Sequence, residues 1–331
     1  MIKSHHLHQN VKAVPHSKIE ENKLKQIYYK AGVYAMALSL IETVFREGFI
    51  YALMAMGVLI TYKILDFPDL SVDGTFPLGA CVAAALITAG FNPWLVCIAA
   101  FLAGACMGSI TGILHVKLGI TDLLSGILVM TASWSINLII TGGKAIFQFF
   151  NLPTIFNSGI AKTLPAAIYA HRQVLIVFVL AVFVKLALDG FLKTKSGLLL
   201  RAGGDNSRFV TSLAHHPGHV KILGLAIGNG CTALAGCVLA QLNENADVNA
   251  GKGMVVMALA AVIIGTGVFR RVSFMKLTTM AVCGAILYKA CLQAALLLGL
   301  PNIYLKLLMA VLLTISIVSQ KIGRKGGALN A

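Results

Sequence analysis

The sequence has few charged residues for its length. Only 12% of its 331 residues are Asp, Glu, Lys or Arg, whereas a soluble domain of this size carries about 25%. Hydrophobic residues make up 58% of the chain, and the mean hydropathy is +0.84. This composition excludes an ordinary soluble globular protein and predicts a chain that is mostly embedded in a bilayer.

The sequence also lacks the motifs of common catalytic sites. Residues 251–253 read GKG, but the upstream glycine and the following Ser or Thr of a phosphate-binding loop are missing. A zinc signature and a G-x-S-x-G motif are absent as well. We therefore expect no ATP hydrolysis on this chain by that route, no catalytic residue, no cofactor and no metal.

The first 30 residues form a polar, basic tail, and residues 31–331 are expected to form one transmembrane domain. The tail contains four histidines, and no acidic or cysteine residue lies among them, so a solvated tail is favoured over a metal site. The seven cysteines all lie in apolar runs without a C-x-x-C pair, which favours small residues at helix contacts. The histidines are His5, His6, His8 and His16.

Nine apolar runs predict membrane-spanning segments. They cover residues 44–64, 75–91, 93–116, 122–142, 172–192, 219–241, 253–270, 274–297 and 303–320. Lipid offers no partners to backbone groups, so these segments must be helices or a closed barrel, and their lack of strict alternation favours helices. A shorter apolar stretch, Ala31–Val44, could lie in the interface. The sequence thus predicts an all-α polytopic protein with about 8–10 transmembrane helices.

The net charge of +15 is concentrated at the ends of these runs. Lys and Arg cluster in the tail and near residues 193–208, 270–276 and 321–325. The positive-inside rule places such segments in the cytoplasm, and this placement argues against nucleic acid as a partner. Alternation then places residues 242–252 outside and the C-terminal tail inside.

Counting back through the first half of the chain gives a conflict. Residues 143–171 fall outside and residues 115–122 inside, so the start of the first long run falls outside, although the tail before it is basic. An extra crossing by residues 31–45, or a re-entrant segment at residues 64–80, would remove the conflict. The sequence leaves both open.

The segment DFPDLSVDGTFPLGA, residues 66–80, interrupts two apolar runs with three carboxylates, two prolines and two glycines. Broken backbone at membrane depth is tolerated only inside protein or around a water-filled cavity, and interrupted helices commonly mark substrate sites in transporters. Pro77 is expected in the first turn of a helix, with Asp73 or Thr75 as the cap. An ordinary surface loop remains the alternative.

Residues 199–236 contain the longest polar loop that is expected in the cytoplasm. Gly203 and Gly204 are expected to end one helix, and a second, short helix is expected from about Asp205 to about His215. A short helix presented to the cytoplasm suits docking on a soluble partner, and a mere connector needs less length. The residues assigned to docking are Gly203, Asp205, Asn206, Arg208, His215, Pro217 and Gly218.

Two further places carry polar residues of interest. The polar segment 241–254 is expected outside, where it would line an entrance or meet another protein, and a solvated loop is equally favoured. Trp134 and Asn137 lie one helical turn apart in the fourth run and share a face. A buried Asn in lipid needs a partner, and structural packing is favoured over a role in transport. The entrance candidates are Gln241, Asn243, Glu244 and Asn245.

At residues 66–80 and 201–236 the sequence resembles permease subunits of ABC importers of the branched-chain amino acid and ribose type. The most similar subgroup is that of the tryptophan/tyrosine transport permeases. The resemblance covers about residue 40 to the end. The subgroup often has a glycine-containing turn where this chain has residues 215–217, His-His-Pro.

The resemblance implies the permease fold of an ABC importer in a bacterial inner membrane. It implies that a second copy completes the pathway, that a separate ATP-binding subunit docks on the coupling loop at residues 199–218, and that an external substrate-binding protein delivers the solute. ATP-driven closure would then rock the bundle between two states. The candidate pathway residues are Asp69, Ser71, Asp73, Thr75 and Phe76, with Trp134 and Asn137 from the fourth run.

Two other classes of protein are alternatives to this interpretation. An ion-coupled secondary transporter would need carboxylates or histidines at mid-span and usually inverted repeats, and the runs hold almost no charge. A membrane enzyme would need a polar constellation on facing helices. An amino acid such as tryptophan or tyrosine is the first expectation for the solute, while a nucleoside, sugar or cofactor remains open.

Overall fold

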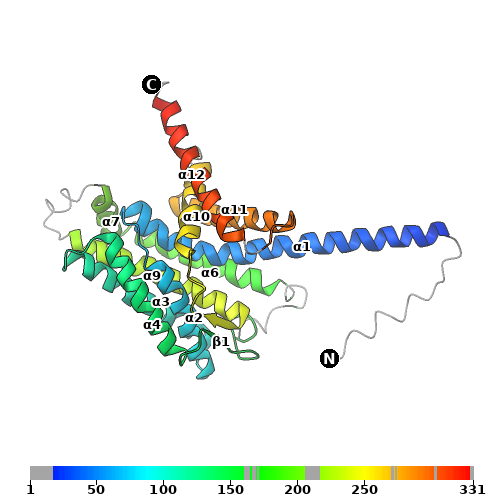
Figure 1. The fold of residues 1–331 in the computed structure, drawn as a ribbon, viewed down its shortest axis with the longest axis horizontal. Coiled ribbons are helices and arrows are strands. Elements are labelled where there is room, and N and C mark those ends of the chain that lie inside the picture. The colour runs from blue at the N-terminus through cyan, green and yellow to red at the C-terminus, as the bar shows by residue number, and fades with distance from the viewer. Residues whose placement is uncertain are drawn as a thin grey trace. The chain divides into compact units, whose positions relative to one another are not determined.

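The computed structural model describes residues 18–159, 165, 169, 171–205, 217–269, 272, 274–301 and 304–328. The chain divides into two units, Met1–Thr43 and Val44–Ala331, and the helical bundle described below belongs to the second. In chain order the elements of Figure 1 are α1 (Lys18–Val58), the π-helix η1 (Leu59–Ile64), α2 (Val72–Thr88), α3 (Pro93–Val116), α4 (Asp122–Ile140), β1 (Ile146–Gln148), α6 (Arg172–Phe191), α7 (Lys195–Asp205), α9 (Pro217–Asn243), β2 (Asn245–Asp247), α10 (Met254–Val268), α11 (Leu277–Leu297) and α12 (Leu305–Ala328).

Within the described part of the chain, six helices are long and apolar enough to cross a bilayer. Three shorter apolar helices accompany them. The all-α polytopic architecture is therefore confirmed, and each of the nine apolar helices falls on one of the nine predicted runs. The long ones are Ala37–Ile64, Pro93–Val116, Asp122–Ile140, Arg172–Phe191, Gly218–Asn243 and Leu277–Leu297, and the shorter ones are Val72–Thr88, Met254–Val268 and Leu307–Val318.

Helices α2, α3 and α9 pack with their backbones almost in contact, and they lie side by side in Figure 1. A Cβ atom added at Gly79 of α2 would lie 1.8 Å from the Ala233 carbonyl oxygen of α9. One added at Gly104 of α3 would lie 2.4 Å from the Asn229 carbonyl oxygen. Small residues at helix contacts are the usual means of close packing in membranes, and here they fix α2 and α3 against α9.

Two short strands join two loops at one end of the bundle. β1 and β2 pair antiparallel, with Phe147 opposite Ala246. The loop after α4 and the loop after α9 therefore lie together. This agrees with the topology in which residues 143–171 and 242–252 share the outer side.

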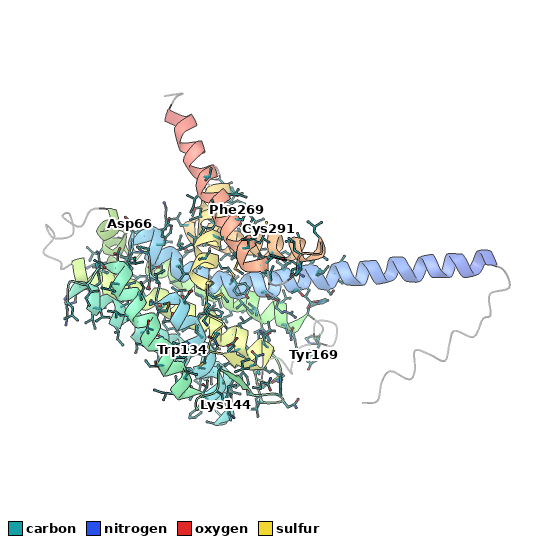
Figure 2. The ribbon with its side chains drawn as sticks, in the orientation of Figure 1. Asp66, Trp134, Lys144, Tyr169, Phe269 and Cys291 are labelled. Carbon is teal, nitrogen blue, oxygen red and sulfur yellow. The ribbon has the colours of Figure 1, made fainter. Side chains whose placement is uncertain are left out.

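The opposite end of the bundle holds the end of α3 and the start of α9. A Cβ atom added at Gly218 would lie 2.2 Å from a methyl carbon of Val116. Asp66 lies toward this end in Figure 2, and Lys144 marks the end that holds the strands. Residues 115–122 and the start of α9 thus lie at one end, as the predicted topology requires.

The expected cap of α2 was wrong. The helix begins at Val72 with Ser71 as its N-cap, and Pro77 lies inside the helix rather than in its first turn. Proline has no N–H to donate to the carbonyl group four residues earlier, which belongs to Asp73. The backbone of Gly251 packs there instead, since a Cβ atom added to it would lie 1.8 Å from the Asp73 carbonyl oxygen.

Gly203 and Gly204 do not end a helix, contrary to expectation. Both lie within helix α7, which the structure describes as far as Asp205. A Cβ atom added at Gly204 would lie 1.7 Å from the Ile64 carbonyl oxygen at the end of η1. The glycine therefore permits a close approach between α7 and η1.

Residues 31–45 belong to α1, which is one uninterrupted helix from Lys18 to Val58. They continue into the first long span, Ala37–Ile64, without a break, and the side of the membrane on which the tail lies stays a prediction. Between η1 and α2 the chain has seven residues, 65–71, without a regular helix.

Candidate functional site

Residues 65–71 connect η1 to α2 and lead into the interior of the bundle. η1 is a π-helix of 6 residues, a form that is frequent at functional sites. Asp66 follows with a positive φ of 53°, and the Phe67 N–H donates to the Thr61 carbonyl oxygen at 2.9 Å. Asp69 and Ser71, which follow this turn, are both buried. The polar segment is therefore not a surface loop.

A buried polar network forms where this segment meets α9. One Asp69 carboxylate oxygen accepts hydrogen bonds from the backbone N–H and hydroxyl of Ser71, at 2.8 and 2.6 Å. The other accepts from the Asn229 amide at 2.6 Å. The Asn229 amide oxygen accepts from the Thr75 hydroxyl at 2.7 Å. Both oxygens of a buried carboxylate thus have donors, which the low dielectric around them requires.

Opposing influences act on the Asp69 carboxyl. Burial raises its pKa above the ordinary value for Asp, and the hydrogen bonds from Ser71 and Asn229 oppose that shift. Asn229 was missed by the sequence analysis. The signal that could have found it is a lone Asn within an apolar span, the same signal that singled out Asn137.

Asp73 holds the start of α10. Its two carboxylate oxygens accept from the backbone N–H groups of Gly253 and Val255, at 3.0 and 2.8 Å. Gly253, the N-cap residue of α10, has no side chain that could do this. A carboxylate at a helix N-terminus also interacts favourably with the helix dipole. Asp73 therefore caps α10, a different helix from the predicted one, and it links α10 to α2.

A cavity of about 220 Å³ lies between α2, α4 and the loop before α10. The fully buried Asn137 donates from its amide to the Gly74 carbonyl oxygen at 3.2 Å. Trp134, which Figure 2 marks on α4, is 47% exposed. The structure thus brings three of the predicted pathway residues to one place. The cavity is lined by Asp73, Gly74, Pro77, Met130, Thr131, Trp134, Asn137, Val248 and Lys252.

Phe76 and Thr75 are buried within α2, away from this lining. The four entrance candidates also lie in different environments. Gln241 is buried, and its amide oxygen accepts from the Ile155 N–H at 3.0 Å, so it ties the loop after α4 to α9. Glu244 has a positive φ of 52° and accepts from the Asn151 N–H at 3.2 Å. Asn243 is exposed at the end of α9, and Asn245 begins β2 opposite Gln148.

The coupling loop is described only in part. Asn206, Arg208 and His215 lie outside the described residues. Gly203 and Asp205 belong to the last turn of α7, and Pro217 and Gly218 begin α9. A cavity of about 290 Å³ between α7 and η1 is lined by Tyr62, Lys63, Ile64, Asp66 and Gly204.

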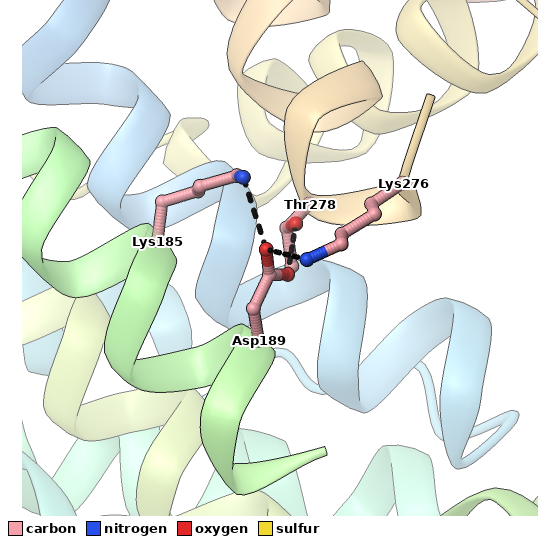
Figure 3. A network of polar contacts seen from close by, with 4 residues as sticks. All are labelled: Lys185, Asp189, Lys276 and Thr278. Atoms are coloured by element: carbon pink, nitrogen blue, oxygen red, sulfur yellow. Dashed lines mark hydrogen bonds and ion pairs between the residues drawn. The ribbon is translucent and has the colours of Figure 1, made fainter. Parts of the chain in front are cut away.

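A charged cluster near the same end was not foreseen. Asp189, near the end of α6, accepts from Lys185 at 2.9 Å and from Lys276 at 3.0 Å (Figure 3). The Thr278 hydroxyl at the start of α11 donates to its other oxygen at 2.5 Å. This cluster fastens the end of α6 to α11 through side chains. Among the described residues, no group of three or more potential metal ligands lies together.

Comparison with known proteins finds a matching family model and several similar proteins. Residues 40–317 match the family model for the permease component of branched-chain amino acid transport systems. The chain is 41% identical over 276 residues to a tyrosine transport system permease protein of Clostridioides difficile (strain R20291), which covers 83% of this chain and 90% of that protein.

More distant relatives include sugar permeases. A galactofuranose transporter permease protein of Escherichia coli (strain K12) is 28% identical over 76% of this chain and 70% of its own length. A ribose import permease protein of Haemophilus influenzae is 24% identical over 68% of each chain. No solved structure matches the chain.

Proposed function

We propose that this chain, which belongs to the family of permease components of branched-chain amino acid transport systems, imports an amino acid such as tyrosine or tryptophan. The chain is a multi-pass membrane protein and a permease subunit of the ABC type, and it is not itself an enzyme. The observation that carries the proposed substrate is the 41% identity to a tyrosine permease over 83% of the chain. The sugar permeases are similar at 28% or less.

The proposed assembly has two copies of this chain in a bacterial inner membrane. A separate ATP-binding subunit docks on each cytoplasmic coupling loop at residues 199–218, and an external substrate-binding protein delivers the amino acid. Helix α4 leaves apolar side chains exposed, since Leu124, Leu128 and Ile139 are 50%, 45% and 78% exposed. These side chains support a contact of α4 with lipid or with a further helix.

A continuous path of contacts supports coupling between the docking loop and the cavity. Helix α7 packs against the end of η1 through Gly204. η1 leads directly into the buried turn that holds Asp69, and Asp69 is linked to α9 through Asn229. The same turn begins α2, whose Asp73 holds α10 beside the cavity. A displacement of α7 would therefore shift η1 and the buried turn, and through them the α2 and α10 residues at the cavity. This chain of packed contacts is the physical basis proposed for coupling.

Assembly with an ATPase tests the proposal. The full chain is co-expressed with ATP-binding subunits encoded beside it, purified and assayed for ATP hydrolysis. We expect a stable complex whose hydrolysis depends on the chain. Asp205→Ala combined with Arg208→Ala is expected to weaken docking without affecting insertion into the membrane. If no ATPase copurifies and no partner's hydrolysis responds to the chain, the proposal is wrong.

A second variant pair tests the path itself. Gly204→Ala places a Cβ atom against the Ile64 carbonyl oxygen, while Gly190→Ala in α6 meets no atom within 4 Å. Because α7 is a helix of only 11 residues, it can shift away from η1 without separating the long helices of the bundle. We therefore expect Gly204→Ala to fold and to assemble with the ATPase but to lose transport per ATP hydrolysed, and Gly190→Ala to behave as wild type. Equal coupling in the two variants would contradict the proposed path.

A further inference from the structure

The cavity beside Asp73 contains a buried acceptor that the protein leaves unused. Asn137 is fully buried, and its Oδ1 atom has no hydrogen-bond partner among the residues that the structure describes. The orientation of the amide is settled by its other end, because the Gly74 carbonyl oxygen can only accept and so must face the Nδ2 group at 3.2 Å. A buried unsatisfied carbonyl oxygen costs about 1–3 kcal/mol, so a donor from a ligand would relieve that cost.

Charges of both signs lie around this acceptor. Asp73 lines the cavity with a carboxylate, and Lys252 lines it with an ammonium group on the adjacent loop. Asp73 accepts hydrogen bonds from the N–H groups of Gly253 and Val255, which hold its carboxylate at the cavity wall. Trp134 contributes an aromatic face that is about half exposed. A wall that combines an acceptor, an anion, a cation and an indole is complementary to a zwitterion.

We propose that this cavity is a recognition subsite for the α-ammonium and α-carboxylate groups of an amino acid. The ammonium group donates to Asn137 Oδ1 and is stabilised by the charge of Asp73. The carboxylate interacts with Lys252, and the indole of Trp134 lies against the ligand's side chain or its ammonium group. This inference rests on the proposed import of an amino acid and assigns the residues that would recognise it.

The size of the cavity limits what it holds. Sites that enclose a whole drug-sized ligand have volumes of about 300–1,000 Å³, and this cavity has about 220 Å³. It therefore receives the common head group of an amino acid and leaves the variable side chain at the exposed Trp134 edge. Such a subsite distinguishes amino acids from neutral sugars and distinguishes poorly among amino acids.

The two tryptophans of the chain allow a direct binding assay. Trp94→Phe leaves Trp134 as the sole tryptophan, so its fluorescence reports on the cavity when it is excited at wavelengths that tyrosine does not absorb. The full-length variant in nanodiscs is titrated with L-tyrosine, N-acetyl-L-tyrosine, L-tyrosine amide and ribose. We expect L-tyrosine to change the signal saturably, and N-acetyl-L-tyrosine, which lacks the ammonium group, to bind at least about tenfold more weakly. Ribose is expected to give no change.

Variants assign the two ends of the ligand. Asn137→Leu is expected to weaken L-tyrosine binding at least about tenfold. Lys252→Gln alters an exposed residue, and it is expected to remove the preference for L-tyrosine over its amide. Thr266→Val, outside the cavity lining, removes a hydroxyl that donates to the Val262 carbonyl oxygen of its own helix at 2.7 Å; it is the control and should bind as the parent does. Equal binding of L-tyrosine and N-acetyl-L-tyrosine, or unchanged binding in Asn137→Leu and Lys252→Gln, overturns the subsite.

Uptake by the reconstituted complex separates this inference from the proposed function. If L-tyrosine is imported with ATP but the apparent affinity is unchanged in Asn137→Leu and Lys252→Gln, the subsite is wrong and the function stands. If no amino acid is imported while the ligand series still discriminates as expected, the proposed function is wrong and the recognition of zwitterions stands.

Discussion

Helices α9 and α6 are both long apolar spans, yet they are held in opposite ways. α9 meets α2 and α3 backbone to backbone, with glycines such as Gly79 and Gly104 at the contacts. α6 is held by side chains, which include the Asp189 cluster and an edge-on contact between Phe49 and Phe178 with ring centres 5.2 Å apart. A cavity of about 710 Å³ with an almost entirely apolar lining separates part of α6 from α3 and α9.

This difference indicates which parts move together. Backbone contacts without side chains between them have one geometry, because interiors are close-packed and deform poorly. Contacts made by long side chains can be remade after a small shift of a helix. We expect α2, α3 and α9 to move as one body during transport and α6 to adjust beside them.

Gly79→Ala should have the largest effect. A Cβ atom 1.8 Å from the Ala233 carbonyl oxygen forces α2 and α9 apart, at a cost of about 3 kcal/mol or more. We expect little folded protein to be recovered from membranes. Gly190→Ala in α6 is the matched control, because open space surrounds it and alanine is the better helix former by up to about 1 kcal/mol. Similar yields and melting temperatures for the two variants would remove the distinction between the helices.

Asn229→Leu should have the next largest effect. It removes the donor to the Asp69 carboxylate and leaves a buried charge with one oxygen unpartnered, at a cost of about 3 kcal/mol. Thermal unfolding in detergent measures the loss. Thr232→Val, in the same helix, removes a hydroxyl that bonds only within α9 at 3.0 Å, and is expected to cost about 1 kcal/mol or less. If the two variants unfold alike, the network is not what joins the broken segment to α9.

Asp189→Asn should have a moderate effect, of about 1–2 kcal/mol, because the variant keeps an acceptor for Thr278 and loses two ion pairs that are partly exposed. Adding Lys276→Met to Asp189→Asn should change the free energy of unfolding little further, since both changes remove the same interaction. A fully additive double variant would show that Lys276 acts independently of Asp189.

Phe183→Leu should have the smallest effect. This side chain is 67% exposed on α6 and borders the apolar cavity, so the free energy of unfolding should change by less than about 0.5 kcal/mol. Phe76→Leu, in the fully packed α2, should cost more than 1 kcal/mol. A loss for Phe183→Leu as large as that for Phe76→Leu would show that α6 is packed as tightly as α2.

The sequence was sufficient to predict the spans, because long apolar runs and basic segment ends depend on the bilayer and not on tertiary contacts. It also identified the broken segment at residues 66–80, since carboxylates and prolines in an apolar run need a protein environment. These features are local, and the nine apolar helices follow them closely.

Hydrogen bonds between residues that lie far apart in the chain could not be predicted from the sequence. The hydrogen bond from Asn229 to Asp69 spans 160 positions, and the bond from Val255 to Asp73 spans 182. Asp73 resembled a cap of its own helix because a local cap is the commoner arrangement. The glycines of α7 resembled a helix end because their close neighbour, η1, cannot be inferred from spacing alone.

Uptake into proteoliposomes tests ATP-driven import by this chain most directly. The chain is reconstituted with its ATP-binding subunit, ATP is enclosed, and labelled L-tyrosine is added outside with the substrate-binding protein. We expect accumulation that requires ATP, the ATPase and the binding protein together. Accumulation driven by an ion gradient without ATP, or ATP hydrolysis without uptake of any amino acid, would contradict the account.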